Sequence, residues 1–132
     1  MNIPMLKPIA HTVFRVLAGL LFAQHGAQKL FGLLGGFGGT PGAKAPLMGM
    51  MGLAGVIEFG GGLLIAIGFF TRPVAALAAA EMAFAYFTVH LPQGFWPIQN
   101  QGELAMLYGA TWVYFATHGA GQFSADGMMK KA

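Results

Sequence analysis

The chain has 132 residues, of which 56% are hydrophobic and 8% are charged, and its formal net charge is +3 at pH 7. Soluble domains carry about a quarter charged residues, so this composition excludes an ordinary water-soluble fold and indicates a protein embedded in lipid. The absence of cysteine also excludes disulfides, zinc–thiolate sites and cysteine-ligated iron–sulfur clusters within this chain.

The positions of the charges divide the chain into apolar segments. A helix that crosses the hydrocarbon layer needs about 20 mostly apolar residues and tolerates few charges. Glu58 is the only charge between Lys44 and Arg72, and Glu81 is the only one in the next segment, from Pro73 to Gly102. We therefore expect a single all-α domain over residues 1–132, a four-transmembrane-helix bundle with helices at about 9–33, 47–70, 73–91 and 103–121.

The first predicted helix, 9–33, is the most polar of the four. Several of its residues recur at steps of three and four, which places them along one stripe that should face protein rather than lipid. Gly19 and Gly26 belong to this stripe and would let a partner helix approach closely. A cleaved signal peptide is the alternative for this segment, but Arg15 interrupts its apolar stretch and disfavours it. The stripe comprises His11, Arg15, Gly19, Phe22, Gly26 and Lys29.

The segments between the later helices are rich in turn-forming residues. Glycines and prolines from Gly32 to Pro46 predict a flexible loop, with a re-entrant turn packed against the bundle as the alternative. Pro73 fits the first turn of the third helix, where its missing N–H is not needed. The segment 91–102 combines turn residues with Phe95 and Trp96, which indicates a loop at the membrane interface before the fourth helix.

The basic residues predict the orientation. They are scattered rather than gathered into a basic stripe, so we expect no nucleic-acid partner. With four helices, both termini share a side with Arg72, and cytoplasmic segments carry the excess of Lys and Arg. We expect both termini in the cytoplasm, with the inverted topology as the alternative. Lys7, Arg72, Lys130 and Lys131 lie on that side, against Lys29 and Lys44 on the other.

Three charged residues are predicted to lie within the bundle: Arg15, Glu58 and Glu81. A charge in the hydrocarbon layer costs about 2.5 to 3.5 kcal/mol on insertion scales, so such residues normally face the interior and mark a buried pair or a site. We expect Arg15 to pair with either carboxylate and fix the helix register. Two carboxylates facing one arginine leave one charge uncompensated unless one binds a proton, so structural pairing and proton handling both remain open.

A second polar group is predicted toward the outer face, at the ends of three helices. The group also includes the loop amides Gln99, Asn100 and Gln101, and we expect it to converge into a pocket made of His25, Gln28, Lys29, His90 and Glu103. An interfacial ion pair between Lys29 and Glu103 is the purely structural interpretation. His25 and His90 lie at similar depth on different helices and could ligate a haem, but membrane histidines more often make helix-to-helix hydrogen bonds.

No metal-ion site is predicted. The methionines Met48, Met50 and Met51 cluster at the start of the second helix. A soft-metal site needs methionines that converge from a loop or from several helices, whereas one methionine-rich helix end indicates flexible packing.

Three segments in this order resemble the DoxX family of small integral membrane proteins. They are HGAQKLFG (25–32), EFGGGLLIAIGFFTRP (58–73) and VHLPQGFWPIQNQGELAMLYGA (89–110). The resemblance implies a four-helix membrane fold and singles out Arg15, Gly26, Lys29 and the segment from Glu58 to Arg72 as family features. It also implies a loose link to oxidoreductase complexes, because related proteins include a subunit of a thiosulfate:quinone oxidoreductase and membrane partners in thiol-oxidation complexes.

Two hypotheses from different classes follow. The first is a small subunit of a redox system in the bacterial inner (plasma) membrane, with a protein partner, contacting a quinone or a small reductant in the predicted pocket; haem is the less favoured cofactor. The second is a non-enzymatic membrane anchor, assembly partner or small-solute permease. Four helices are few for a transport path, so a permease predicts a homo-oligomer. Both hypotheses leave open whether this chain itself catalyses a reaction.

Overall fold

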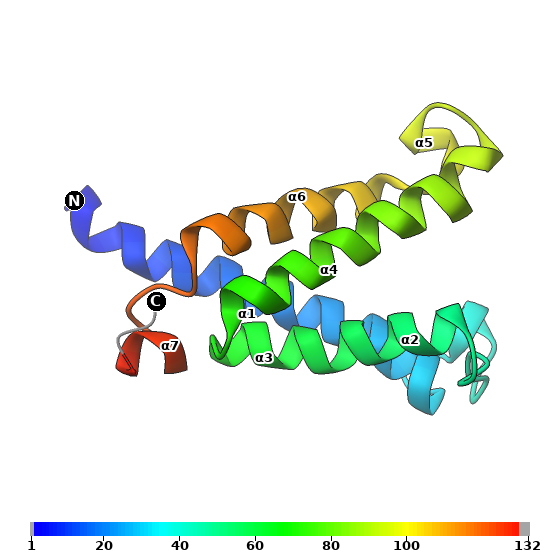
Figure 1. The fold of residues 1–132 in the computed structure, drawn as a ribbon, viewed down its shortest axis with the longest axis horizontal. Helices are drawn as coiled ribbons and strands as arrows, with labels where there is room; N and C mark the ends of the chain where they lie inside the picture. Colours follow the sequence, from blue (N-terminus) through cyan, green and yellow to red (C-terminus); the bar gives the residue numbers. More distant parts are fainter. Residues whose placement is uncertain (1, 130–132) are drawn as a thin grey trace.

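The structure, a computed structural model, describes residues 2–129, and all regular elements in this range are helical, which confirms the predicted all-α class (Figure 1). Lys130 and Lys131, used for the predicted orientation, lie outside the described residues. The elements are α1 (Ile3–Phe31), the 3₁₀ turn η1 (Phe37–Gly39), α2 (Met50–Val56), the π-helical turn η2 (Ile57–Gly61), α3 (Gly62–Ile67), α4 (Thr71–Ala85), the π-helical turn η3 (Tyr86–His90), the 3₁₀ turn η4 (Leu91–Gln93), α5 (Pro97–Asn100), α6 (Glu103–His118) and α7 (Ala125–Met128).

Within the described residues, three helical segments are long and apolar enough to cross a membrane: Ile3–Phe31, Met50–Ile67 and Thr71–Gln93. The second and third include π-helical turns, through which the backbone continues without a break. Helix α6 has 16 residues, fewer than the roughly 20 of a typical span. It ends at His118, before the predicted 121, because Gly119 leaves the helical region with φ 79° and ψ −173°.

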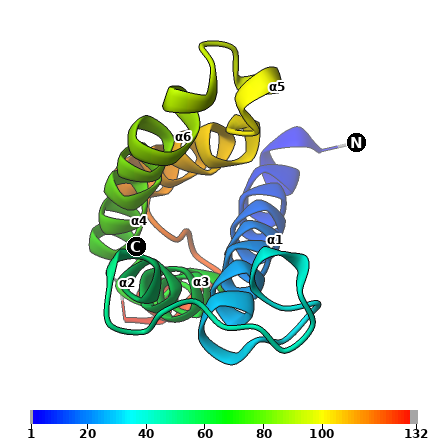
Figure 2. The same cartoon turned by 90° about the vertical axis from the view of Figure 1, so that its right-hand side faces the viewer.

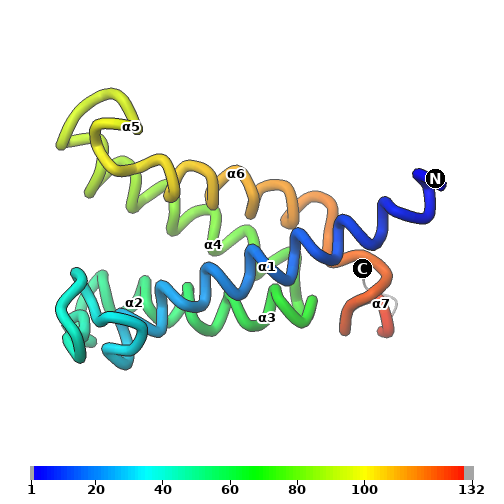
Figure 3. The backbone as a smooth tube through the Cα atoms, turned by 180° about the vertical axis from the view of Figure 1, so that it is seen from behind, coloured from blue at the N-terminus to red at the C-terminus, as the bar shows by residue number. Residues whose placement is uncertain are grey.

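The long helical segments form two antiparallel pairs. Helix α1 packs against the continuous segment α2–η2–α3, and α4 packs against α6. The two pairs diverge toward the end that carries α5 and the loop 32–49, as the views from both sides show (Figures 1 and 3). Seen from that end, the four segments surround a common axis (Figure 2). The N-terminal end of α1 and α7 lie at the opposite end.

Close backbone contact holds α1 against its partner. A Cβ atom on Gly19 would lie 2.6 Å from the carbonyl oxygen of Gly62, and one on Gly62 would lie 2.6 Å from the amide nitrogen of Ala23. A Cβ on Gly26 would collide with the backbone of Phe59. The prediction that Gly19 and Gly26 allow a close helix approach is confirmed, because any larger residue would push the two backbones apart.

Aromatic residues fill the space between the pairs. Phe22 from α1, Ile65 from α3, and Trp112 and Phe115 from α6 are fully buried. Alanines of α4 such as Ala75 pack against this cluster and let α6 approach. Most other large apolar side chains of the long helices are exposed, as expected of a surface covered by lipid.

Candidate functional site

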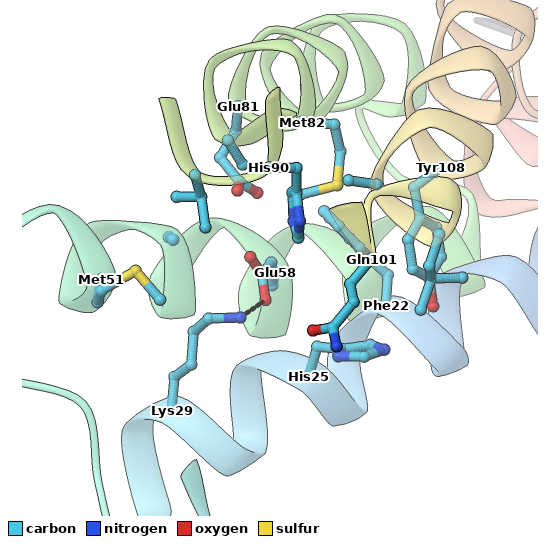
Figure 4. A pocket seen from close by; sticks show the side chains of 15 residues that line it. Phe22, His25, Lys29, Met51, Glu58, Glu81, Met82, His90, Gln101 and Tyr108 are labelled. Carbon is cyan, nitrogen blue, oxygen red and sulfur yellow. Dashed lines mark hydrogen bonds and ion pairs between the residues drawn. The ribbon is translucent and has the colours of Figure 1, made fainter. Parts of the chain in front are cut away.

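A pocket lies where the two helix pairs diverge (Figure 4). Its cavity has a volume of about 280 Å³, and residues of α1, α2, η2, α4, η3 and α6 form its walls. Apolar side chains, among them Phe22 and Met82, make up much of the lining. The polar part of the lining consists of His25, Lys29, Glu58, Glu81, His90 and Gln101, together with the phenol of Tyr108.

An ion pair between Lys29 and Glu58 lies in the polar part of the pocket. The Lys29 Nζ is 2.6 Å from the Glu58 Oε1, and the two side chains are 15% and 4% exposed. From the sequence, Arg15 was expected to pair with Glu58 or Glu81, and a Lys29–Glu103 pair was the structural alternative. Instead Lys29 pairs with Glu58, and Arg15 bonds to backbone carbonyl oxygens. The observed pair links α1 to η2 through the interior, so it stabilises the same contact that the glycines allow.

Glu81 adds a second carboxyl group to this pair. It extends from α4 into the same cavity as Glu58 (Figure 4). Its Oε1 is buried without a hydrogen-bond partner. One ammonium group therefore faces two carboxyl groups, and the charges of this trio balance only when one carboxyl group carries a proton. The argument made for Arg15 from the sequence thus applies to Lys29 instead.

Both π-helical turns contribute to the pocket. Glu58 lies in η2 and His90 lies in η3. A π turn inserts an extra residue into the helical repeat, which changes the direction of the side chains around it and is frequent at functional sites. The His90 Nδ1 lies 3.1 Å from the carbonyl oxygen of Asn100, so the loop after η3 fixes the orientation of this ring.

The buried side chain of Asn100 holds that loop in place. Its amide nitrogen donates to the carbonyl oxygen of Gly94 at 2.8 Å, and its oxygen accepts from the backbone N–H of Gly102 at 2.8 Å. Gln101, in the left-handed conformation with φ 61°, lies between these anchored residues and lines the pocket. The sequence analysis placed both amides in the outer polar group; Gln101 lines the pocket, whereas Asn100 holds the loop.

Of the five predicted pocket residues, three line the cavity and two do not. His25, Lys29 and His90 line it, and the His25 ring meets Tyr108 edge-on at a centroid distance of 5.8 Å. Gln28 instead donates to the carbonyl oxygen of Leu34 at 2.8 Å, outside this pocket. Glu103 is exposed at the first turn of α6. The structure therefore brings the two histidines and the lysine to one cavity and places Gln28 and Glu103 elsewhere.

Arg15 lies at the other end of the bundle and does not reach Glu58 or Glu81. Its guanidinium donates to the carbonyl oxygens of Ala120, Phe123 and Ala66, the last two at 3.0 and 3.3 Å. Helix α1 begins at Ile3 rather than near residue 9 and projects beyond the other helices. Arg15 is consequently level with the ends of α3 and α6, where it anchors the segment that follows α6.

Asp126 completes this anchoring, and its role was missed from the sequence. Its carboxylate accepts hydrogen bonds from the backbone N–H groups of Phe70 and Thr71, at 3.0 and 2.9 Å. These groups begin α4 and have no partner within that helix, so Asp126 caps α4 from a distant part of the chain. The local signal was Ser124, which caps the short helix α7 itself.

The cavity suits a single ring better than a macrocycle. Pockets for small molecules usually measure about 300 to 1,000 Å³, and this one, at about 280 Å³, is slightly smaller. A haem held by His25 and His90 would need far more room than one ring. Among the described residues, no group of three or more His, Cys, Asp or Glu is placed to hold a metal ion. The mixed lining instead fits an apolar ring with polar substituents.

Comparison with known proteins gives one family and one relative. The sequence model of the DoxX family matches residues 10–91, more than half of the chain. An uncharacterized protein of Haemophilus influenzae is 37% identical over 128 residues, which cover 95% of this chain and 94% of the relative. No solved structure matches the chain. The region matched by the family model includes Lys29, Glu58, Glu81 and His90.

Proposed function

Because the chain belongs to the DoxX family, we propose that it is a small membrane subunit of a redox system and binds a quinone in the pocket described above. The observation that carries this proposal is the trio of Lys29, Glu58 and Glu81, with Glu58 buried and the other two half-buried, in an otherwise largely apolar cavity. Such charges are costly inside a membrane protein and are usually retained for a function.

The apolar helices make this chain a multi-pass membrane protein. We further propose that α6 is a fourth span and that both termini face the cytoplasm of a bacterium, with the chain in its inner membrane. The pocket then lies in the outer half of the bilayer, at the end that carries the loop 32–49 and α5. In this position it is accessible both to a ligand dissolved in lipid and to a small reductant from outside.

The lining matches the chemistry of a quinone head group. The Lys29 ammonium can donate to a ring carbonyl oxygen, while Phe22 and Met82 offer apolar contact to the ring. A quinone, when bound, would accept two electrons and two protons to become a quinol. Glu58 and Glu81 would supply the one proton that they share, and the second would come from water. The two electrons would come from a small sulfur-containing reductant or a partner subunit, because this chain has no cysteine.

Purification in mild detergent tests whether the pocket binds quinone. We expect the wild-type protein to retain quinone that can be extracted with solvent and quantified by chromatography, and we expect Lys29→Ala to lose most of it. Lys44→Ala removes an exposed lysine of the loop and should retain the wild-type amount. Equal quinone content in both variants would contradict the proposed site.

The same preparation separates this proposal from the non-enzymatic alternative. An anchor or an oligomeric permease predicts a stable homo-oligomer without bound quinone. We expect quinone to be present whatever the oligomeric state, so a quinone-free oligomer that is insensitive to Lys29→Ala would favour the alternative.

A further inference from the structure

A second cavity lies on the outer surface of α4 and α6. It has a volume of about 250 Å³, and nearly all of its lining is apolar. Ala83, Phe87, Met106 and Ala110 line it and are exposed, so this groove opens onto the surface that lipid covers. The small side chains along its floor leave room for a narrow, flexible group.

The groove and the pocket share one wall. Met82 of α4 and Ala105 of α6 line both cavities, so these two side chains separate the interior from the groove. Ala105 contributes a single methyl group. Met82 is an unbranched thioether with three rotatable bonds, and on the pocket side it shares the lining with His90 and Tyr108 (Figure 4). This wall is therefore thin and can open by a rotamer change.

The wall separates a polar side, in the pocket, from an apolar side, in the groove. The pocket side contains the buried Lys29–Glu58 pair and the Glu81 oxygen without a partner, whereas the groove side is apolar. A water-soluble reductant would bind the polar groups of the pocket and gain no affinity from the apolar groove. A molecule with a polar head and a long apolar tail would use both.

We propose that the ligand of the pocket is such a tailed, lipid-soluble molecule: its head lies beside Lys29 and Glu81, and its tail passes between Met82 and Ala105 into the α4–α6 groove. This inference rests on the proposed quinone site and specifies the class of ligand and its route from the lipid. The α4–α6 pair thus serves as the lateral opening of the pocket.

Two quinones with the same head group and different tails test this inference. One carries a single isoprene unit and the other a ten-carbon alkyl tail, and each is titrated into the purified protein. Ala83→Leu fills the groove at an exposed position, so folding should not be affected. Ala76→Leu is the matched control, because Ala76 is exposed on α4, lies two turns earlier on the same face, and lines neither cavity.

We expect Ala83→Leu to weaken binding of the long-tailed quinone by about tenfold, which corresponds to roughly two lost methylene contacts, and to leave the short-tailed quinone unchanged. Ala76→Leu should change neither affinity.

If Ala83→Leu affects both quinones equally, or neither, the tail route is wrong while the quinone site stands. If Ala83→Leu instead converts a dimer into a monomer at unchanged affinities, the groove binds a second copy of this chain and the inference is overturned. If the wild-type protein binds neither quinone, the proposed function itself fails.

Discussion

Lys29 is the residue on which the electrostatic balance of the interior depends. Its ammonium group is 2.6 Å from Glu58; the Glu58 side chain is buried and the Lys29 side chain is half-buried. Removing one partner of a buried pair leaves the other charge without compensation, which costs much more than the pair contributes. The contribution of the pair to stability can therefore be separated from the cost of an uncompensated charge only by comparing both single variants with the double variant.

We expect Lys29→Met to destabilise the protein by about 2 kcal/mol, somewhat less than for a fully buried pair because Lys29 is partly exposed. Glu58→Gln added to Lys29→Met should restore most of this loss, since Glu81 then keeps the proton and no buried charge lacks its partner. Thermal unfolding in detergent, compared across both single variants and the double variant, measures the coupling. Additive losses would show that the two residues do not stabilise the fold as a pair.

Asp126 provides a second test at the residue scale, at the other end of the bundle. Its two carboxylate oxygens cap the start of α4, and an amide offers a single acceptor oxygen. We expect Asp126→Asn to lower the unfolding free energy by about 1 kcal/mol, the usual contribution of a cap, while quinone retention stays unchanged. A normal thermal stability, or a loss of quinone at normal stability, would contradict this assignment.

At the scale of elements, the helices were predictable and their relative depth was not. Apolar segments with few charges predicted four helices, of which three are long enough to span a membrane among the described residues. The spacing of Gly19 and Gly26 predicted the face of α1 that meets its partner. Arg15 and Lys29 lie on that same face, so the periodicity alone did not determine which of them pairs with Glu58. The choice depended on where α1 begins, and six further residues before position 9 move Arg15 to the end of the bundle.

The π-helical turns were also beyond sequence reasoning. Val56 and Gly62, which flank η2, have ordinary α-helical backbone dihedrals. The hydrophobic pattern of an apolar segment is the same whether or not one turn contains an extra residue, so it does not reveal a π-helical turn. The extra residue nevertheless determines the direction of Glu58. The same holds for His90 in η3, whose place in the pocket was predicted only because it ends a helix.

The glycine contact between α1 and η2 makes a prediction at this scale. Gly26→Ala places a methyl group against the backbone of Phe59 and Gly55, whereas Gly60→Ala places it in open space. We expect Gly26→Ala to destabilise the protein and Gly60→Ala to leave it as stable or to stabilise it by up to about 1 kcal/mol, the gain in helix propensity. Thermal unfolding of the two variants measures this difference, and similar melting temperatures would contradict the close packing.

For the whole molecule, the orientation in the membrane decides which compartment the pocket faces. The absence of cysteine makes this measurable, because any introduced thiol is unique. We expect Lys44→Cys, in the loop 32–49, to react with a membrane-impermeant maleimide in intact cells. Gln122→Cys, after α6, should react only once the inner membrane is made permeable. The reverse pattern would establish the inverted topology and a pocket in the cytoplasmic half.

The central claim is that the Lys29 pocket supports a quinone-linked redox reaction in the membrane. The most direct measurement is quinone-dependent oxidation of thiosulfate, sulfide or thiols by membranes from a strain that lacks the gene and carries the wild-type or a variant copy. We predict that the wild-type protein and Lys44→Ala restore this activity and that Lys29→Ala does not, although all three are present in equal amounts. Full activity with Lys29→Ala, or undiminished activity in the strain that lacks the gene, would contradict the claim.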